Sequence, residues 1–412
     1  MADPLVVLIA ARDEEARIGQ TVESLRRAFP QAEVVVADDG SRDSTAAAAG
    51  RAGARVVRLP RLGKGQALTL AEREAPPGAL LLCDADLEGD PAPLLDGADL
   101  AIADFAERQG GGLGIAKRAG RMLVRALSGF EAREPLSGQR ALSQAARDVC
   151  FPLAPGFGCE VRMTIDAVRA GLRVEERELP LRHRATGRDA GGFAHRCRQL
   201  LDAVLACGPT AVNHRGLRLP LVGALVALGG GKAPARVRLG VAGIVLLGLA
   251  DDLWSGPERG FRAHLAKGST TGVAKAVGIP LVALATTRSL RKATVVALAA
   301  NVLNQVDTRP GRALKAFLVG AALVRGPAKS YIPIAVLLAP YDLREMTMLG
   351  DAGANALGAL LGYGSVGKLT ARGQLFAIAA LAGLTAVGEA RSLGDLIERT
   401  PLLSRLDRLG RA

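Results

Sequence analysis

Short apolar runs alternate with amphipathic stretches through the first half of the chain. Four runs rich in β-branched or apolar residues predict strands, and the stretches of helix-forming residues between them predict helices. The predicted strands are 4–11, 33–37, 55–59 and 80–83, and the predicted helices are 15–28, 45–52 and 65–73. Because strands that alternate with helices are typical of a parallel, doubly wound sheet, residues 1–210 are predicted to form one α/β domain.

The second half has a different pattern, with apolar stretches separated by short polar loops. Eight stretches rich in Ala, Leu, Val and Gly occupy 219–230, 236–250, 272–287, 293–303, 313–324, 331–340, 352–366 and 374–390. Many are shorter than the roughly 20 residues that cross a bilayer comfortably. We interpret residues 211–392 as an all-α polytopic membrane domain of about eight helices, and residues 393–412 as a cytosolic tail.

Eight crossings would bring the acidic motifs of this half to one side of the membrane. If the chain enters from the cytosol, Asp251–Asp252, Asp307, Asp351 and the tail all emerge there. No leader is expected, because the apolar run at 5–11 is short and continues into a charged loop. Lys and Arg residues of the opposite loops leave the orientation open. The sequence thus predicts a multi-pass protein of the cell membrane, with its first domain in the cytoplasm.

Composition narrows the choice of partners. Only 3% of the 412 residues are aromatic and 50 are glycine, which suits close packing of helices in a membrane. The net charge of +13 agrees with anionic lipid or a phosphorylated substrate. Nucleic acid is not expected, since no basic run is interleaved with aromatic residues and no zinc-finger or RNA-recognition signature is present. The five cysteines have no C-x-x-C spacing, as expected in a reducing compartment.

Acidic motifs follow two of the predicted strands. Asp38–Ser41 comes after the second strand and Asp84–Asp86 after the fourth. In a parallel sheet, ligands bind at the carboxyl ends of the strands, and carboxylates there are good ligands for a hard cation. The two motifs therefore predict a site that handles a phosphate through Mg²⁺ or Mn²⁺.

Residues 6–95 resemble family 2 glycosyltransferases with the Rossmann-like GT-A fold. The resemblance rests on four motifs in the family's order, Ala10–Glu15, Val36–Ser41, Gly63–Gly65 and Asp84–Leu87. Dolichyl-phosphate mannose synthases share the last of these motifs. The resemblance implies an enzyme that uses a UDP- or GDP-linked sugar and a divalent metal. The donor-binding residues that it implies are Ala10, Arg12, Glu14, Asp39, Ser41, Lys64 and Asp84, and the implied metal ligands are Asp84 and Asp86.

The resemblance continues toward the glucosyl-3-phosphoglycerate synthase branch of this family. Pro155–Glu160 and Leu181–Arg184 carry it, and Ser137–Arg140 is similar to the family's acceptor-side loop. It implies that His183 completes the metal site. Glu160 would orient the acceptor or act as a base, with an ordinary carboxylate at a helix start as the alternative. Asp13 stands where the family usually has Asn, which leaves the nucleobase open.

Residues 213–390 resemble the polyprenyl-phosphate N-acetylhexosamine-1-phosphate transferase superfamily. The matching motifs are Arg218–Gly223, Leu249–Asp252, Asn301–Asp307 and Leu349–Gly353. Ionisable residues beside membrane helices are costly and by default mark a site. The resemblance implies that Asp351 holds Mg²⁺ and that Asp251 and Asp252 deprotonate or position a lipid phosphate. It also implies that Asn304 and Asp307 complete the cleft, and that Arg262 and Lys275 engage phosphates.

This second half departs from that superfamily in two respects. It has about eight crossings where roughly ten are usual, and no histidine cluster follows Asp351. A domain that only binds polyprenyl phosphate, or only anchors the first domain, is therefore an alternative to a second active site.

Three functions follow from these observations. The first is a membrane-bound glycosyltransferase that transfers a hexose to a polyprenyl-linked or phosphorylated acceptor in cell-envelope glycan synthesis, with or without phosphosugar transfer by the second domain. The second is a soluble-acceptor synthase of the glucosyl-3-phosphoglycerate type with a non-catalytic membrane anchor. The third is an interaction protein that uses an inactive transferase half as a scaffold. Homo-oligomers are compatible with all three.

Overall fold

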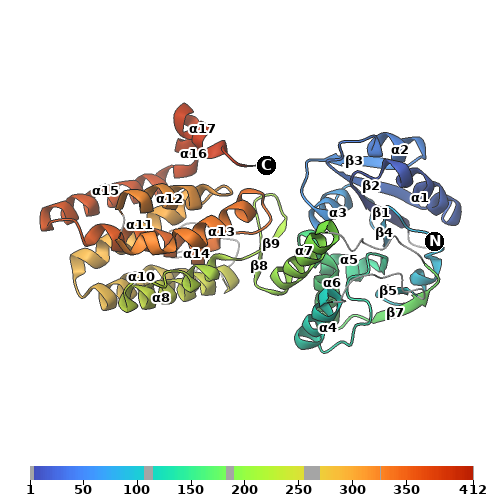
Figure 1. The fold of residues 1–412 in the computed structure, drawn as a ribbon, viewed down its shortest axis with the longest axis horizontal. Helices are drawn as coiled ribbons and strands as arrows, with labels where there is room; N and C mark the ends of the chain where they lie inside the picture. The colour runs from blue at the N-terminus through green and yellow to red at the C-terminus, as the bar shows by residue number, and fades with distance from the viewer. Residues whose placement is uncertain (1–3, 106–114, 182–189, 255–269, 325, 412) are drawn as a thin grey trace. The chain divides into compact units, whose positions relative to one another are not determined.

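The chain forms two compact units, Met1–Pro220 and Leu221–Ala412. The computed structural model describes residues 4–105, 115–181, 190–254, 270–324 and 326–411, and Figure 1 shows the elements of each unit. The boundary lies later than the predicted one at residue 210. The reason is a hairpin of β8 (Thr210–Val212) and β9 (Arg218–Pro220), whose antiparallel pairing keeps these residues with the first unit.

A seven-stranded sheet forms the centre of the first unit. Its strands, in the order in which they pair, are β3 (Arg55–Leu59), β2 (Glu33–Asp39), β1 (Leu5–Ala11), β4 (Ala79–Asp84), β6 (Arg140–Leu142), β5 (Leu100–Phe105) and β7 (Val174–Leu179). Only β6 is antiparallel to its neighbours. This arrangement confirms the prediction of an α/β domain with a mostly parallel sheet.

Helices cover both faces of this sheet (Figure 1). They are α1 (Glu15–Ala28), α2 (Thr45–Arg51), α3 (Lys64–Glu72), α4 (Ile115–Ser128), α5 (Gln144–Cys150), α6 (Cys159–Arg169) and α7 (Ala190–Cys207), with short 3-10 turns η1 (Ala92–Leu95) and η2 (Gly156–Gly158). Val7 and Ile9 of β1 pack with Ile18 of α1 on one face, while Val6 and Leu8 pack with residues of α3 on the other. Strands buried on both faces read as continuous apolar runs, which is why this strand was predictable.

The second unit is helical. It contains η3 (Gly223–Leu228), α8 (Ala235–Trp254), α10 (Thr270–Thr287), α11 (Leu290–Val306), α12 (Arg312–Val324), η4 (Gly326–Tyr331), α13 (Ile332–Leu343), α14 (Gly350–Val366), α15 (Ala371–Ala390), α16 (Leu393–Arg399) and α17 (Pro401–Arg408). Helix α14 is the most buried and packs against α8, α11 and α12. Gly248 of α8 and Gly358 of α14 lie at these contacts, where a Cβ would meet the backbone of the neighbouring helix.

The first predicted apolar helix, 219–230, is wrong as an α-helix. Strand β9 ends at Pro220, and the six-residue turn η3 follows before the glycines at 229–231. Gly223 lies against the first turn of α14. At the other end, Gly230 lies against Tyr331 of η4, and η4 lies beside the last turn of α14. The segment therefore still runs from one end of the unit to the other, as a 3-10 turn flanked by extended chain.

Membrane crossing by this unit stays a prediction. Among the described helices, α15 has the length and apolar composition to cross a bilayer, and only 6% of it is buried within the unit. The apolar part of α10, Gly272–Thr287, is shorter. Helices α12 and α13 have 13 and 12 residues, which extend about 20 Å, less than the ~30 Å hydrocarbon core. Eight helical crossings are therefore not confirmed.

Candidate active site

Strand register brings the two acidic motifs of the first unit to one edge of its sheet. Ala10 of β1 pairs with Ala37 of β2 on one side and with Asp84 of β4 on the other. Ala11 pairs with Asp38. The segments ending in Asp39 and Asp84 thus flank the end of β1, at the carboxyl ends of three parallel strands. Ligands of parallel sheets bind at such an edge.

Lys64 joins two carboxylates at this edge. Its Nζ lies 2.7 Å from an Asp84 oxygen and 2.8 Å from a Glu160 oxygen. Lys64 opens α3 and Glu160 lies in the first turn of α6. Burial alone would lower the pKa of the Lys64 ammonium, but the two carboxylates outweigh burial and raise that pKa well above its usual range. The ammonium is therefore charged and offsets the charge of both acids.

Gly138 and Gln139 complete the surroundings of Asp84. Gln139 donates from Nε2 to Asp84 Oδ2 at 2.8 Å, and its Oε1 accepts the Asp84 backbone N–H at 3.1 Å. A Cβ at Gly138 would lie 2.5 Å from an Asp84 oxygen and 2.6 Å from Lys64 Nζ, so a larger residue does not fit. Sequence reasoning connected this loop only with the acceptor. It missed Gln139 because no local pattern predicts that β6 pairs with β4.

Asp39 fixes the loop that leads to Lys64. Its Oδ1 accepts the backbone N–H of Leu62 at 2.6 Å and that of Gly63 at 3.0 Å. Gly63 has a φ of +97°, a conformation that favours glycine. Burial raises the pKa of the Asp39 carboxyl, and the two hydrogen bonds oppose that rise. A nucleobase or ribose at Asp39 would share this carboxylate with the loop.

Polar contacts fix the loop after β1 to the loop after β2. Ser41 Oγ accepts the backbone N–H of Asp13 at 3.0 Å, and Asp13 Oδ1 accepts that of Arg42 at 2.8 Å. Glu14 donates its backbone N–H to Thr45 Oγ1 at 2.8 Å. Ser41 and Glu14, both predicted to bind the donor, thus also set the geometry of the two loops.

Three further predicted residues of this site are Arg12, Asp86 and His183. Arg12 is half-buried directly after β1, and its buried Nε makes no hydrogen bond within the described part of the chain but lies 3.6 Å from an Asp13 oxygen. Asp86 is half-buried in the turn after β4. His183 lies outside the described residues. Within 4–105, 115–181 and the other described ranges, no three His, Cys, Asp or Glu side chains form a metal cage.

A buried aspartate holds the turn that precedes Glu160. Asp202 of α7 is 6% exposed, and its Oδ2 accepts the backbone N–H of Phe157 at 3.1 Å. A Cβ at Gly156 or Gly158 would overlap Asp202. Burial raises the pKa of the Asp202 carboxyl. Sequence reasoning missed Asp202 because it lies 45 residues from Phe157 in a helix without a recognisable motif.

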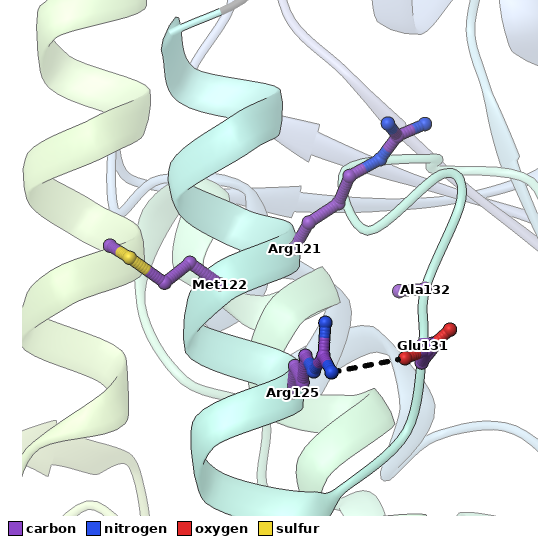
Figure 2. Close-up of a pocket in the computed structure, with 5 residues that line it drawn as sticks. All are labelled: Arg121, Met122, Arg125, Glu131 and Ala132. Atoms are coloured by element: carbon purple, nitrogen blue, oxygen red, sulfur yellow. Dashed lines mark ion pairs between the residues drawn. The ribbon is translucent and has the colours of Figure 1, made fainter.

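A cavity of about 330 Å³ lies between α4 and the segment around Glu131. Figure 2 shows Arg121, Met122 and Arg125 on the helix, with Arg125 facing Glu131 across the opening at 3.5 Å. Both members of this ion pair are exposed, and such pairs contribute little. None of the residues predicted for the active site lines this cavity.

The acidic motifs of the second unit also converge. Lys275 of α10 lies 2.6 Å from Asp251 at the end of α8, and it pairs with Asp351 at the start of α14 as well. The two oxygens of Asp252 accept the backbone N–H groups of Asp351 and Ala352, at 2.9 and 3.0 Å. Asp252 therefore caps α14 and positions Asp351 through the backbone.

Asp342 links this cluster to the segment directly before α12. It accepts the backbone N–H of Gly311 at 2.6 Å and that of Leu349 at 3.1 Å. Asp307 is near enough to Asp342 and Asp351 to interact electrostatically with both. Asn304, half-buried one turn earlier, accepts the backbone N–H of Asp307 at 3.1 Å through its carbonyl. The three acidic motifs thus share one end of the unit, which we call the acidic end; Arg262 lies outside the described residues.

Comparison with known proteins assigns a family to the first unit. Residues 6–109 match the family described as "Glycosyl transferase family 2". The first unit contains a family 2 glycosyltransferase domain. The chain is 32% identical to Glycosyltransferase AglJ of Haloferax volcanii over 185 residues, 42% of this chain. It is 31% identical to glucosyl-3-phosphoglycerate synthase of Mycolicibacterium paratuberculosis over 204 residues, 40% of this chain. The chain spans 60% of the length of each of these relatives.

Solved structures of glucosyl-3-phosphoglycerate synthase from Mycobacterium tuberculosis are also similar to this chain. The complex with Mn²⁺, uridine diphosphate and phosphoglyceric acid aligns with a TM-score of 0.43 and 28% identity, over 51% of this chain and 81% of that chain. The complex with phosphoglyceric acid aligns with a TM-score of 0.43 and 26% identity, over 51% and 84%.

Proposed function

We propose that the first unit transfers a hexose from a UDP- or GDP-linked sugar to a phosphorylated acceptor. The observation that carries this proposal is the position of Lys64 between Asp84 and Glu160 at the ligand-binding edge of a family 2 domain. A nucleotide sugar leaves behind a diphosphate, and a fixed ammonium at this edge offsets the negative charge that develops there. A phosphorylated acceptor agrees with the name of the glucosyl-3-phosphoglycerate synthase relative.

The residues at this edge fit a divalent cation. Asp84 and Asp86 supply carboxylates from one turn, and Gln139 orients Asp84. Mg²⁺ is commonly bound by one or two carboxylates plus substrate phosphates, which suits a site without a complete protein cage. When bound, Mg²⁺ or Mn²⁺ would act as a Lewis acid on the diphosphate. The Arg12 Nε makes no hydrogen bond within the described residues and lies 3.6 Å from an Asp13 oxygen, so it is a further donor for the nucleotide.

Glu160 acts in this proposal as a positioning residue. Its side chain is 3% exposed, and Lys64 and the Cys159 thiol contact its carboxylate. A carboxylate buried to this degree holds the ammonium in place, whereas Asp84, with 30% of its side chain exposed, can meet the substrate. We therefore favour the role of Glu160 in holding Lys64 over a role as the base.

The second unit is proposed to be a membrane domain that presents polyprenyl phosphate. Large apolar side chains on its surface support this, because all but four of those exposed in the described residues lie in this unit. Lys275, held by two aspartates at the acidic end, is a cation for a lipid phosphate. The chain would then be a multi-pass protein of the cell membrane that acts in cell-envelope glycan synthesis, with its first unit in the cytoplasm.

A second candidate is transfer to a soluble phosphorylated acceptor, with the second unit as an anchor. The similarity to a synthase named for 3-phosphoglycerate favours it, because the family resemblance includes the turn that leads to Glu160.

One assay tests both candidates. The full chain, purified in detergent, would receive Mg²⁺ or Mn²⁺, radiolabelled UDP- and GDP-sugars, and either undecaprenyl phosphate or 3-phosphoglycerate. We expect release of UDP or GDP that Asp86→Asn abolishes and the exposed control Asp96→Asn does not. Release independent of Asp86 would contradict the first proposal.

The same assay separates the functions of the second unit. Loss of lipid-linked product in Asp351→Asn, with the exposed Asp395→Asn as its control, would support presentation of polyprenyl phosphate. Release of UMP that depends on Asp351 would instead indicate phosphosugar transfer. Full activity on 3-phosphoglycerate in both the wild type and Asp351→Asn, with no lipid-linked product from the wild type, would favour the anchor.

A further inference from the structure

The C-terminal helices α16 and α17 are fixed to the second unit by buried charges. Arg312, the first residue of α12, is 3% exposed, and its guanidinium pairs with both Asp407 oxygens at 2.7 and 3.0 Å. Lys315, one turn further, donates from Nζ to the Leu409 carbonyl at 3.0 Å. A two-point contact between guanidinium and carboxylate sets orientation as well as position. The residues predicted to be a tail thus form a docked pair of helices.

Docking leaves an apolar face of α17 outside. Leu402 and Leu406 of α17 and Leu409 directly after it fall within about 60° of one another at 100° per residue, and Asp407 lies about 100° or more from each of them. These leucines are 68%, 52% and 62% exposed. Arg405 lies about 40° beyond one edge of the leucine face and Arg408 about 60° further round on the same side, and both are exposed. The helix therefore has a charged docking side, an apolar outer side and a basic border.

The docked helices lie at the acidic end. Gly394 of α16 faces Thr308 and Arg312, since a Cβ there would overlap their side chains. Arg411 donates from Nε to the Pro310 carbonyl at 2.9 Å. Thr308 and Pro310 belong to the segment between α11 and α12, which follows Asp307, and Arg312 opens α12. Whatever covers the outer face of α17 therefore lies at the same level of the unit as the candidate phosphate site.

A lipid surface suits this face better than a second copy of the chain. Helix α16 follows directly after α15, the described helix that is long and apolar enough to cross a bilayer. A helix with leucines on one side and arginines at the border is typical of the membrane interface, and arginines complement anionic headgroups. In a symmetric pair of chains, Arg405 and Arg408 would meet like charges on the partner's copy of the same face.

We propose that the leucine face of α17 lies in the headgroup layer of an anionic membrane. The proposal rests on the membrane association of the second unit proposed above. It adds a second contact with the bilayer beside α15, and it places the acidic end at the depth of lipid phosphates. Lys275 and Asp351 would then meet a polyprenyl phosphate without drawing it out of the bilayer.

Quenching of a single tryptophan by brominated lipid tests this contact. Trp254 is the only tryptophan, so Trp254→Phe with Leu406→Trp gives the full chain one reporter on the leucine face. Ser24→Trp in the same background, at an exposed position of α1, is the control. Both chains are placed in nanodiscs of brominated phosphatidylcholine, with and without phosphatidylglycerol. We expect strong quenching at position 406 in the anionic discs and none at position 24.

Charge variants test the anionic preference. Arg405→Gln with Arg408→Gln should lower the equilibrium constant for docking of α17 on the anionic discs, by about fivefold for each arginine lost. Arg51→Gln with Arg58→Gln removes the same charge from exposed positions of the first unit and should leave quenching unchanged. Equal quenching in neutral and anionic discs would overturn the electrostatic part of the proposal.

The remaining outcomes separate this proposal from the one on which it rests. A chain that enters the discs without quenching at position 406 would overturn the docking of α17 and leave membrane association intact. Shielding of position 406 in detergent that rises with protein concentration would assign the face to a second copy and overturn the proposal. A chain that fails to enter the discs would overturn both.

Discussion

The two units build the same arrangement of charges from different elements. In the first, Lys64 joins Asp84 and Glu160; in the second, Lys275 joins Asp251 and Asp351. The lysine side chains are 18% and 19% exposed. Each cluster contains one deeply buried acid, since the side chains of Glu160 and Asp251 are 3% and 5% exposed. Each also contains one accessible acid, since the side chains of Asp84 and Asp351 are 30% and 29% exposed. The first cluster uses the end of a strand, whereas the second uses the ends of helices.

The difference lies in what surrounds each cluster. The first lies at the edge of a buried sheet, in a unit where few large apolar side chains are exposed. The second lies in the unit that carries most of the exposed large apolar side chains of the described residues, which is what the proposed membrane contact requires. We infer from this comparison that, in each cluster, the buried acid holds the ammonium while the accessible acid is free to meet a ligand. Under the proposed function, the phosphate-bearing ligand would reach the first cluster from water and the second cluster from the bilayer.

Replacing each lysine should give the largest effects and tests whether the clusters work independently. Lys64→Met leaves two acids without their cation. We expect a loss of about 100-fold or more in nucleotide-sugar turnover and of about 2–4 kcal/mol in the stability of the first unit. Lys275→Met should instead abolish lipid-linked product and leave nucleotide release on a soluble acceptor unchanged.

The exposed Lys368→Met is the control for both lysine variants and should change neither measurement. The comparison fails if Lys275→Met lowers turnover on the soluble acceptor as much as Lys64→Met does.

Sequence reasoning predicted the elements that have a local signal. Strands β1 to β4 and helices α1 to α3 lie within one or two residues of the predicted ranges, because buried runs such as Val6–Ile9 and the loop motifs between them are read directly. Strand β6 was not predicted. It has three residues and runs antiparallel inside a parallel sheet, so neither length nor periodicity reveals it.

The partners of the candidate site residues were harder to predict than the residues themselves. Lys64 and Asp84 came from motifs, but Gln139 and Asp202 reach the site from positions 55 and 45 residues away from their partners. In the second unit, the alternation of apolar stretches placed Asp251 and Asp351 at one end, yet Asp342 carries no motif. Contacts that depend on tertiary packing leave no periodic trace in a single sequence.

Gly138→Ala should have the next largest effect, within the first cluster alone. The added Cβ would overlap the Asp84 carboxylate and would lie 2.6 Å from the Lys64 ammonium, so one of them must move. We expect turnover to fall by about 100-fold, because misplacement of a catalytic group by about 1 Å has an effect of that size. Steady-state nucleotide release measures it.

The matched control for Gly138→Ala is Gly50→Ala, in a helix with open space around the glycine. It should be neutral or slightly stabilising. Wild-type turnover in Gly138→Ala would show that the contact between Lys64 and Asp84 is not needed.

Gly248→Ala tests whether the second cluster depends on close packing of α8 against α14. A Cβ there would lie 2.5 Å from the Ala352 Cα, next to Asp351, and would push α8 away from α14. We expect a loss of about 1–3 kcal/mol in the stability of the second unit, measured by calorimetry of the full chain in detergent. Gly383→Ala in α15, with nothing within 4 Å, should have no such effect. Equal transitions in the two variants would contradict close packing of α8 on α14.

Asp202→Asn should have the smallest effect on the stability of the first unit. It compares two buried acids, because Glu160 is paired with a lysine and Asp202 is not. Burial raises the pKa of the Asp202 carboxyl in the folded state. The folded chain therefore holds this proton to higher pH than the unfolded chain, and the stability that Asp202 contributes falls as pH rises from its ordinary pKa through the folded one. An amide still accepts the Phe157 N–H and does not ionise. The stability of the variant relative to wild type should thus increase as pH rises above the ordinary pKa of an aspartate, about 4.

Thiol labelling reports this change in the first unit alone, because all five cysteines lie before residue 221. Cys83 and Cys150 are buried, so a pyridyl disulfide, which stays reactive in weak acid, labels them only on unfolding. Urea midpoints for the wild type, Asp202→Asn and the exposed control Asp96→Asn would be compared across the pH range. A wild type that gains stability over Asp202→Asn as pH rises would instead show that Asp202 is ionised and paired with a cation. The first unit would then hold two buried acids stabilised by cations, with Arg198, 3.9 Å away, as the partner of the second.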